Sequence, residues 1–266
     1  MSKKPLILVT NDDGITAPGI RTLIKVMNTI GDVVVVAPDS PQSGMGHAIT
    51  VNDTLFCRAE HIDNGPQKEY STSGTPADCI KLAKHEILNR APDLCVSGIN
   101  HGSNASINVI YSGTMSAAIE AGIEGIPAIG FSVCDYSWEA KFEPFEGYIK
   151  SISENVLKNG LKEGTVLNVN FPKVEKHEIK GVKICRQSKA NWVENFDKRQ
   201  SPHGQDYYWL TGEFVNLDDG KDTYQWALEN GYISIVPVQY DLTNHHAIRY
   251  INKNWKLNVL FVFGLT

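Results

Sequence analysis

Short apolar runs alternate with helical patterns through the first half of this 266-residue chain. The runs are apolar almost throughout, and they lie at Pro5–Thr10, Asp32–Pro38, Asp93–Ser97 and Pro127–Val133. Helical patterns fill most of the gaps, at residues 18–30, 75–89 and 113–122. Strands that are apolar at every position are buried on both faces, as in parallel sheets covered by helices. The alternation therefore predicts an α/β fold with a doubly wound, mostly parallel, Rossmann-like sheet.

Beyond residue 135 the pattern loosens into mixed signals. A helix is expected at 143–159, with strands at 166–171 and 182–187, a helix at 223–230, a strand at 232–236 and a terminal helix at 244–255. A polar stretch at 188–204 precedes the aromatic segment Tyr207–Trp209, and this arrangement predicts a β-hairpin. We therefore predict a Rossmann-like catalytic core over residues 1–135. A C-terminal elaboration over 136–266 is expected to complete the active site and contribute to oligomerisation.

Composition excludes several classes of protein. The formal net charge of −5 argues against a protein that binds a nucleic-acid duplex through a basic face. No apolar stretch approaches the ~18 residues that a membrane span requires, and the first run is too short for a signal-peptide core. The five cysteines are widely spaced and contain no C-x-x-C pair, which favours a reducing compartment. We expect a cytoplasmic protein without a membrane partner.

Polar loops follow three of the predicted strands. They contain Asn11–Gly14 after the first strand, Asp39–Gly44 after the second, and Gly98–Asn104 after the run that ends at Ser97. Ligands bind outside the carboxyl ends of the strands in an open parallel sheet, so these loops should converge on one crevice. They bring carboxylates, amides, hydroxyls and glycines to it, and no thiolate.

Two adjacent aspartates, Asp12 and Asp13, stand directly after the first strand. Neighbouring carboxylates repel each other, so their placement directly after a buried strand at the switch point favours a bound cation over a solvated turn. A hard cation such as Mg²⁺ or Mn²⁺ prefers oxygen ligands. The predicted metal ligands are Asp12, Asp13, Ser43 and Asn100.

A second signal lies at Tyr111–Ala118, where small hydroxyl residues and a glycine open an Ala-rich helix. Ser112 and Thr114 are candidate N-caps, and the free N–H groups of the first turn can bind an anion. The two interpretations are compatible.

The segments together resemble the SurE family of survival proteins, which are divalent-metal-dependent 5′/3′-nucleotidases. The matching stretches are Ile7–Ile20, Val35–Gly44, Gly74–Cys79, Val96–Asn104, Val109–Gly122 and Asp241–His245. The resemblance implies that Asp12, Asp13, Ser43 and Asn100 hold one divalent ion per subunit. It places Asn104 and the Ser112–Gly113–Thr114 turn at the phosphate, and His245 near the active site. It also implies a homodimer or homotetramer that assembles through the C-terminal region.

The site residues predict phosphomonoester hydrolysis by a metal-activated water. The resemblance implies that the substrates are nucleoside 5′-monophosphates, with 3′-monophosphates as a second class. Asp12 or Asp13 would also orient the water, and His245 is a candidate acid for the leaving alkoxide. Base stacking is open among Tyr111, Trp192, Tyr207 and Trp209.

Three alternatives compete with this prediction. An aspartyl-phosphate phosphatase needs carboxylates in D-x-D spacing, but Gly14 stands at that position. A dinucleotide-dependent oxidoreductase needs a G-x-G-x-x-G turn, which the first strand lacks. A nucleotide sensor would bind nucleotide with metal and never turn it over.

Overall fold

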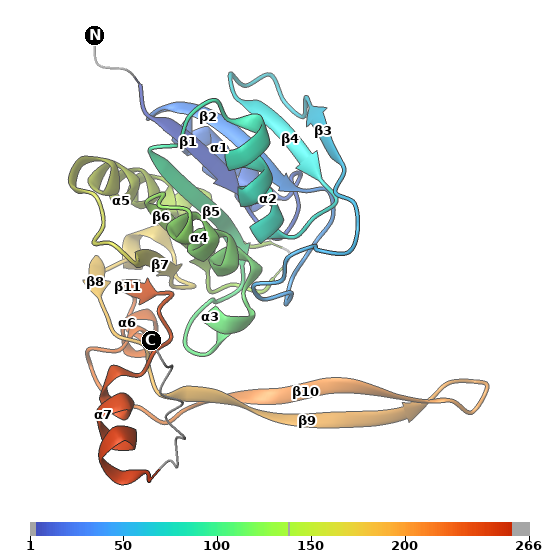
Figure 1. Ribbon diagram of the computed structural model, residues 1–266, viewed down its shortest axis with the longest axis vertical. Helices are drawn as coiled ribbons and strands as arrows, with labels where there is room; N and C mark the ends of the chain where they lie inside the picture. Colours follow the sequence, from blue (N-terminus) through green and yellow to red (C-terminus); the bar gives the residue numbers. More distant parts are fainter. Residues whose placement is uncertain (1–3, 138, 257–266) are drawn as a thin grey trace, which may run out of the picture.

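A nine-stranded sheet forms the body of the protein in the computed structural model, which describes residues 4–137 and 139–256 (Figure 1). In spatial order the strands are β3 (Cys57–Glu60), β4 (Lys68–Thr72), β2 (Asp32–Pro38), β1 (Leu6–Thr10), β5 (Leu94–His101), β6 (Ala128–Val133), β7 (Thr165–Phe171), β11 (Ile233–Gln239) and β8 (Val182–Ile184). Within the described part of this sheet, only the β3–β4 and β7–β11 pairs are antiparallel. The predicted doubly wound, mostly parallel α/β fold is confirmed.

The order in which the chain adds strands to the sheet reverses at β1, the fourth of the nine strands. From β1 the chain adds β2 and β4 on one side, and then returns to add β5, β6 and β7 on the other. Such a switch point opens a crevice at the carboxyl ends of the two neighbouring strands, here β1 and β5. The polar loops predicted to converge there follow these two strands and β2.

Helices cover both faces of the sheet (Figure 1). On one face α1 (Pro18–Met27) contacts α5 (Glu146–Asn159), and on the other α2 (Pro76–Leu82) contacts α4 (Gly113–Ile123). Side chains alternate between the two faces along a strand, so each strand contributes side chains to the hydrophobic core on both faces of the sheet. In β1, Ile7 and Val9 join the core beneath α1 and α5, whereas Leu8 joins the core beneath α2 and α4.

The observed helices begin and end close to their predicted boundaries. Thr75 caps α2 in a capping box with Asp78, and Pro76 occupies its first turn. A π-helical turn continues it from Ala83 to Ile87, so the helical segment ends two residues before the predicted end at 89. A 3₁₀ turn at Glu143–Phe145 likewise leads into α5.

The C-terminal half contains the long hairpin of β9 (Ala190–Gln200) and β10 (Asp206–Asn216), which extends away from the sheet (Figure 1). The stretch at 188–204, predicted as a polar segment before the hairpin, mostly forms its first strand. The remaining helices are α3 (Asn108–Tyr111), α6 (Tyr224–Glu229), α7 (His245–Asn254) and a 3₁₀ turn at Lys176–Glu178. Strands β3 and β4 lie in a segment for which no strand was predicted.

Residues on both sides of position 135 build the same sheet, because β7, β11 and β8 extend it beyond β6. The division into a core at 1–135 and an elaboration at 136–266 stays a prediction. No helix among the described residues is long and apolar enough to cross a membrane.

Candidate active site

The loop after β1 is held in place by hydrogen bonds on both sides of the aspartate pair. Asn11 Nδ2 donates to the Gly14 carbonyl oxygen at 2.8 Å, and Gly14 has a φ of +99°, which glycine adopts without strain. The backbone N–H of Gln42 donates to the backbone carbonyl oxygen of Asp12 at 2.7 Å. The loop after β2, which contains Ser43, is thereby tied to the loop that contains Asp12 and Asp13.

A cavity of about 710 Å³ opens where these loops meet the hairpin. Five of the predicted site residues line it: Asp12, Ser43, Asn100, Asn104 and Ser112. It is also lined by Gly44, His101, Ser103, Asn108, Tyr111, Tyr136, Trp192, Glu194, Leu210, Thr211 and Gly212. The convergence predicted from the strand ends therefore places most of the candidate residues around one space.

Asp12 is 3% exposed, and its carboxylate lies against the start of α4. Burial and the neighbouring charge of Asp13 raise its pKa to about 6, although hydrogen bonds from Thr114 work in the opposite direction. The Thr114 hydroxyl donates to Asp12 Oδ1. Gly113 is required beside it, because a Cβ at this position would lie 2.6 Å from the Asp12 Cβ and 2.8 Å from Oδ2.

The carboxylate of Asp13 lies beside β5. Burial raises its pKa, and a hydrogen bond from the His101 backbone N–H to Oδ2, at 3.3 Å, partly offsets this effect. A cation beside a buried and a partly buried carboxylate, both with raised pKa values, would stabilise their ionised forms.

The donor set fits a hard divalent cation. Among residues 4–137 and 139–256 no group of three or more His, Cys, Asp or Glu side chains could hold a metal, so an ion at Asp12 and Asp13 depends on neutral oxygens for its other protein ligands. Ser43 and Asn100 offer a hydroxyl and an amide oxygen at the same cavity. Two carboxylates with neutral oxygens and water suit Mg²⁺ or Mn²⁺ better than a softer metal.

The start of α4 provides donors for an anion. Ser112 caps the helix, and its Oγ accepts from the Met115 N–H at 3.0 Å, which leaves the hydroxyl proton available. The Thr114 hydroxyl proton is already directed to Asp12. Ser112 lines the cavity. Gly113 and Thr114 are not among the described residues that line it, and both lie against Asp12.

His245 does not lie at this cavity in the structure of the single chain. It is exposed at the first position of α7, and its Nε2 lies 3.1 Å from Asp241 Oδ2. It is not among the described residues that line the cavity. Its role as an acid stays a prediction.

Comparisons with known proteins identify the family of this chain. The family model described as Survival protein SurE matches residues 7–194. The chain belongs to the SurE family. It is 70% identical to the 5′-nucleotidase SurE of Christiangramia forsetii over 96% of this chain and 98% of that protein. It is 47% identical to the 5′-nucleotidase SurE of Bacteroides fragilis over 96% and 99%. The crystal structure of the SurE protein from Aquifex aeolicus matches with a TM-score of 0.81 and 40% identity, over 94% of this chain and 99% of that one.

The sequence of this SurE-family chain named Trp192 among four candidate stacking residues but did not predict which part of the hairpin forms the wall of the cavity. Trp192 on β9 donates from Nε1 to Asn108 Oδ1 at 2.8 Å, which fixes its ring beside α3. Tyr136 accepts a hydrogen bond from the Ser103 amide at 3.2 Å. Of the four aromatic residues considered for base stacking, Tyr111 and Trp192 line the cavity, and Tyr207 and Trp209 do not. The spacing of residues in the chain does not reveal which part of a hairpin faces a distant loop.

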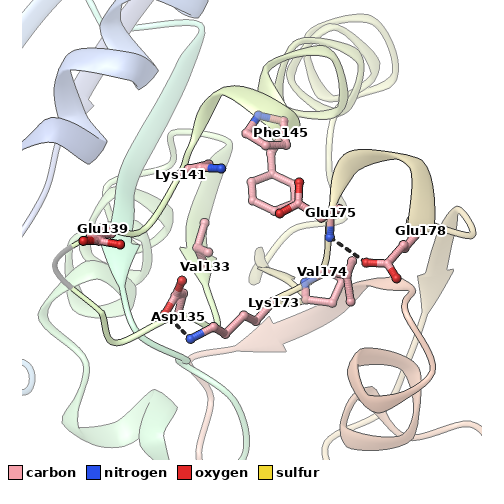
Figure 2. Close-up of a pocket in the computed structure, with 11 residues that line it drawn as sticks. Val133, Asp135, Glu139, Lys141, Phe145, Lys173, Val174, Glu175 and Glu178 are labelled. Carbon is pink, nitrogen blue, oxygen red and sulfur yellow. Dashed lines mark hydrogen bonds and ion pairs between the residues drawn. The ribbon is translucent and has the colours of Figure 1, made fainter.

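A second cavity of about 300 Å³ lies beyond the ends of β6 and β7 (Figure 2). Lys173 Nζ lies 2.8 Å from Asp135 Oδ1 there, and this interaction lowers the pKa of Asp135 to about 2. Its two labelled lysines, Lys141 and Lys173, stand among four carboxylates, and Asp12 and Asp13 do not line it. The larger cavity is the one that Asp12 and Ser112, at the start of α4, line.

Proposed function

We propose that this SurE-family protein is a 5′-nucleotidase that hydrolyses nucleoside 5′-monophosphates to nucleoside and phosphate at the cavity beside Asp12. Nucleoside 3′-monophosphates are the second substrate class of the proposal. The observation that supports it most is the meeting of the buried carboxylate of Asp12, whose neighbour in the chain is Asp13, with the donor-rich start of α4 at one cavity. A phosphomonoester needs both a cation for its charge and fixed donors for its oxygens.

The proposed cofactor is one divalent ion per subunit, Mg²⁺ or Mn²⁺, held by Asp12, Asp13, Ser43 and Asn100. When bound, such an ion supplies a reactive water and neutralises phosphate charge. Asp12 or Asp13 also accepts a hydrogen bond from the attacking water and orients it for in-line attack.

The phosphate oxygens are proposed to bind the start of α4. The Ser112 hydroxyl and the Gly113 N–H donate to the phosphate oxygens, and the N-terminus of α4 stabilises the negative charge. Thr114 acts through Asp12, to which its hydroxyl donates. Asn104 retains one amide N–H for the phosphate, because its other one donates to Ser132.

The nucleoside is proposed to occupy the part of the cavity between α3 and the hairpin. Tyr111, Tyr136 and Trp192 supply aromatic surface there, and bases stack on such rings with little dependence on sequence. The hydrogen bond from Trp192 to Asn108 holds one of these rings in place before substrate arrives.

His245 is the proposed proton donor to the leaving alkoxide, on the strength of the family resemblance. A homodimer or homotetramer is proposed through the C-terminal region, where α7 and the hairpin expose large apolar side chains such as Tyr250 and Phe196. The proposed compartment is the cytoplasm, and all five cysteines are free thiols, as a reducing environment would keep them.

The experiment that tests the function is phosphate release from a panel of nucleoside 5′- and 3′-monophosphates with Mg²⁺, with Mn²⁺ and with EDTA. The proposal predicts release from the 5′ series that requires the metal and stops in EDTA. Metal-dependent nucleotide binding without release under any of these conditions would contradict it and identify a nucleotide sensor instead.

A further inference from the structure

Three polar side chains lie in register across neighbouring strands of an otherwise apolar part of the sheet. Asn100 on β5 pairs with Ser132 on β6, and Ser132 pairs with Asn170 on β7; these three strands run side by side in Figure 1. Ser132 is 0% exposed and Asn170 is 1% exposed. Polar groups buried in this way are costly unless each finds a hydrogen-bond partner, so the arrangement calls for a specific set of partners.

Asn104, in the loop after β5, connects all three members of this row. Its Nδ2 donates to Ser132 Oγ at 2.6 Å, and its backbone N–H donates to Asn170 Oδ1 at 3.0 Å. Its Oδ1 accepts from Asn100 Nδ2 at 3.3 Å. Asn104 is 5% exposed, so these contacts are made mostly out of water, where hydrogen bonds are electrostatically stronger.

Asn168 completes the network from the same face of β7, two residues before Asn170. Its Nδ2 donates to the Asn104 carbonyl oxygen at 2.8 Å, and its Oδ1 accepts from Asn170 Nδ2 at 2.8 Å. Both backbone groups of Asn104 are therefore held by side chains of a strand two positions away from β5 in the sheet.

The network determines which atom of Asn100 faces the cavity. Asn100 Nδ2 donates to the Gly102 carbonyl oxygen at 2.8 Å and to Asn104 Oδ1, and both partners are acceptors. A flipped amide would bring its oxygen against these two oxygens. Asn100 Oδ1 is therefore the atom left free to bind a cation.

We propose that Asn104, Ser132, Asn168 and Asn170 form a buried amide network that positions Asn100 Oδ1 as a ligand of the divalent ion. The inference rests on the metal site of the proposed function. Asn168 and Asn170 are not among the described residues that line the cavity, so they act on the ion only through Asn104 and Asn100. Outer partners of this kind change metal affinity when they are removed.

The test is Mn²⁺ binding by calorimetry in the absence of nucleotide, for wild type, Asn104→Ser, Asn170→Leu and the double variant. In Asn104→Ser the serine side chain is too short to reach Asn100. Asn170→Leu keeps the side-chain size but removes the hydrogen bonds of Asn170 to the Asn104 N–H and to Asn168 Oδ1. Each is expected to raise the Kd for Mn²⁺ roughly tenfold. The double variant should be little worse than the weaker-binding single variant, because both changes act through the same amide.

Two controls separate positioning from general loss of stability. Thr223→Val removes a buried hydroxyl that donates to the Gly220 carbonyl oxygen at 2.8 Å, far from Asn100 in the chain; it should lower the midpoint of thermal unfolding in EDTA and leave the Kd unchanged. Asn104→Asp keeps an acceptor for Asn100 and should bind Mn²⁺ at least as tightly as wild type. If Asn170→Leu does not fold, the comparison of Asn104→Ser with Asn104→Asp carries the test.

Wild-type affinity in folded Asn104→Ser, or in folded Asn170→Leu, would overturn the positioning network. Because binding is measured without nucleotide, this result is distinct from failure of the proposed function. A protein that binds Mn²⁺ through the network and releases no phosphate would contradict the nucleotidase and leave the network intact.

Discussion

Replacing Asp12 by asparagine is expected to stabilise the metal-free protein while abolishing its binding of the divalent ion. Burial and the charge of Asp13 raise the pKa of Asp12 from its ordinary value of 3.8 to about 6. A group whose pKa is raised on folding contributes its full stability below its unfolded pKa, and loses it as the pH rises through the folded value. The wild-type protein without metal should therefore lose stability between about pH 4 and pH 7 through this carboxylate.

The size of the effect follows from the two pKa values. The difference between 3.8 and about 6 is worth about 3 kcal/mol of unfolding free energy at pH 8. Asparagine has nearly the same shape, carries no charge, and keeps an acceptor for the Thr114 hydroxyl. Asp12→Asn should therefore raise the melting temperature in EDTA at pH 8 by roughly 2 °C per kcal/mol, or about 6 °C. The gain should vanish near pH 4, where the wild-type carboxyl is protonated.

A matched variant, Asp78→Asn, is expected to change the stability in the opposite direction. Although burial raises the pKa of Asp78, hydrogen bonds from Thr50 and Thr75 outweigh this effect and lower it. Asp78→Asn should therefore destabilise the protein at pH 8. Thermal unfolding in EDTA across pH 4–8 measures both variants. If Asp12→Asn were no more stable than wild type at pH 8, or kept the same advantage at pH 4, the reasoning about an uncompensated buried charge would be refuted.

Three further predictions concern the cavity and the proposed proton donor. Gly113→Ala should weaken Mn²⁺ binding and cost about 1–3 kcal/mol of stability, because the added Cβ would meet Asp12. The control Gly147→Ala in α5 places its Cβ in open space and should be neutral or stabilising. Calorimetry measures the Mn²⁺ affinity of both variants, and unfolding measures their stability. Trp192→Ala should raise KM for nucleoside monophosphates roughly tenfold with little change in kcat, since base stacking is worth about 1–3 kcal/mol, and an unchanged KM would exclude the ring from binding. His245→Gln should lower kcat for a nucleotide roughly 100-fold and spare p-nitrophenyl phosphate, whose leaving group needs no proton; equal losses on both substrates would argue against an acid role.

The parallel sheet and the location of the site could be predicted because both depend on local patterns. The runs at Pro5–Thr10 and Asp32–Pro38 are apolar at nearly every position, and short runs of this kind rich in β-branched residues are typical of strands buried on both faces. The polar residues that follow such strands meet at the switch point as a consequence of topology. Asp12, Ser43 and Asn100 were therefore placed at one cavity from their positions in the chain alone.

Other parts depend on contacts that no local pattern records. Strands β3 and β4 are short, and β3 is largely exposed, so they carry no continuous apolar signal. Trp192 reaches the cavity because a hairpin from the C-terminal half folds beside α3, and its chain position does not indicate this. One available signal was missed: Asn168 and Asn170 alternate within the apolar strand β7, and two amides on one buried face require partners.

The most direct test of the account is phosphate release from adenosine 5′-monophosphate at increasing Mn²⁺ by wild type, Asp12→Asn and Asp78→Asn. The account predicts metal-dependent release by wild type, release by folded Asp78→Asn with a similar Mn²⁺ requirement, and none by folded Asp12→Asn at any Mn²⁺ concentration. Release by Asp12→Asn at the wild-type rate and with the wild-type Mn²⁺ requirement would contradict the claim that the carboxylate at the end of β1 holds the catalytic ion.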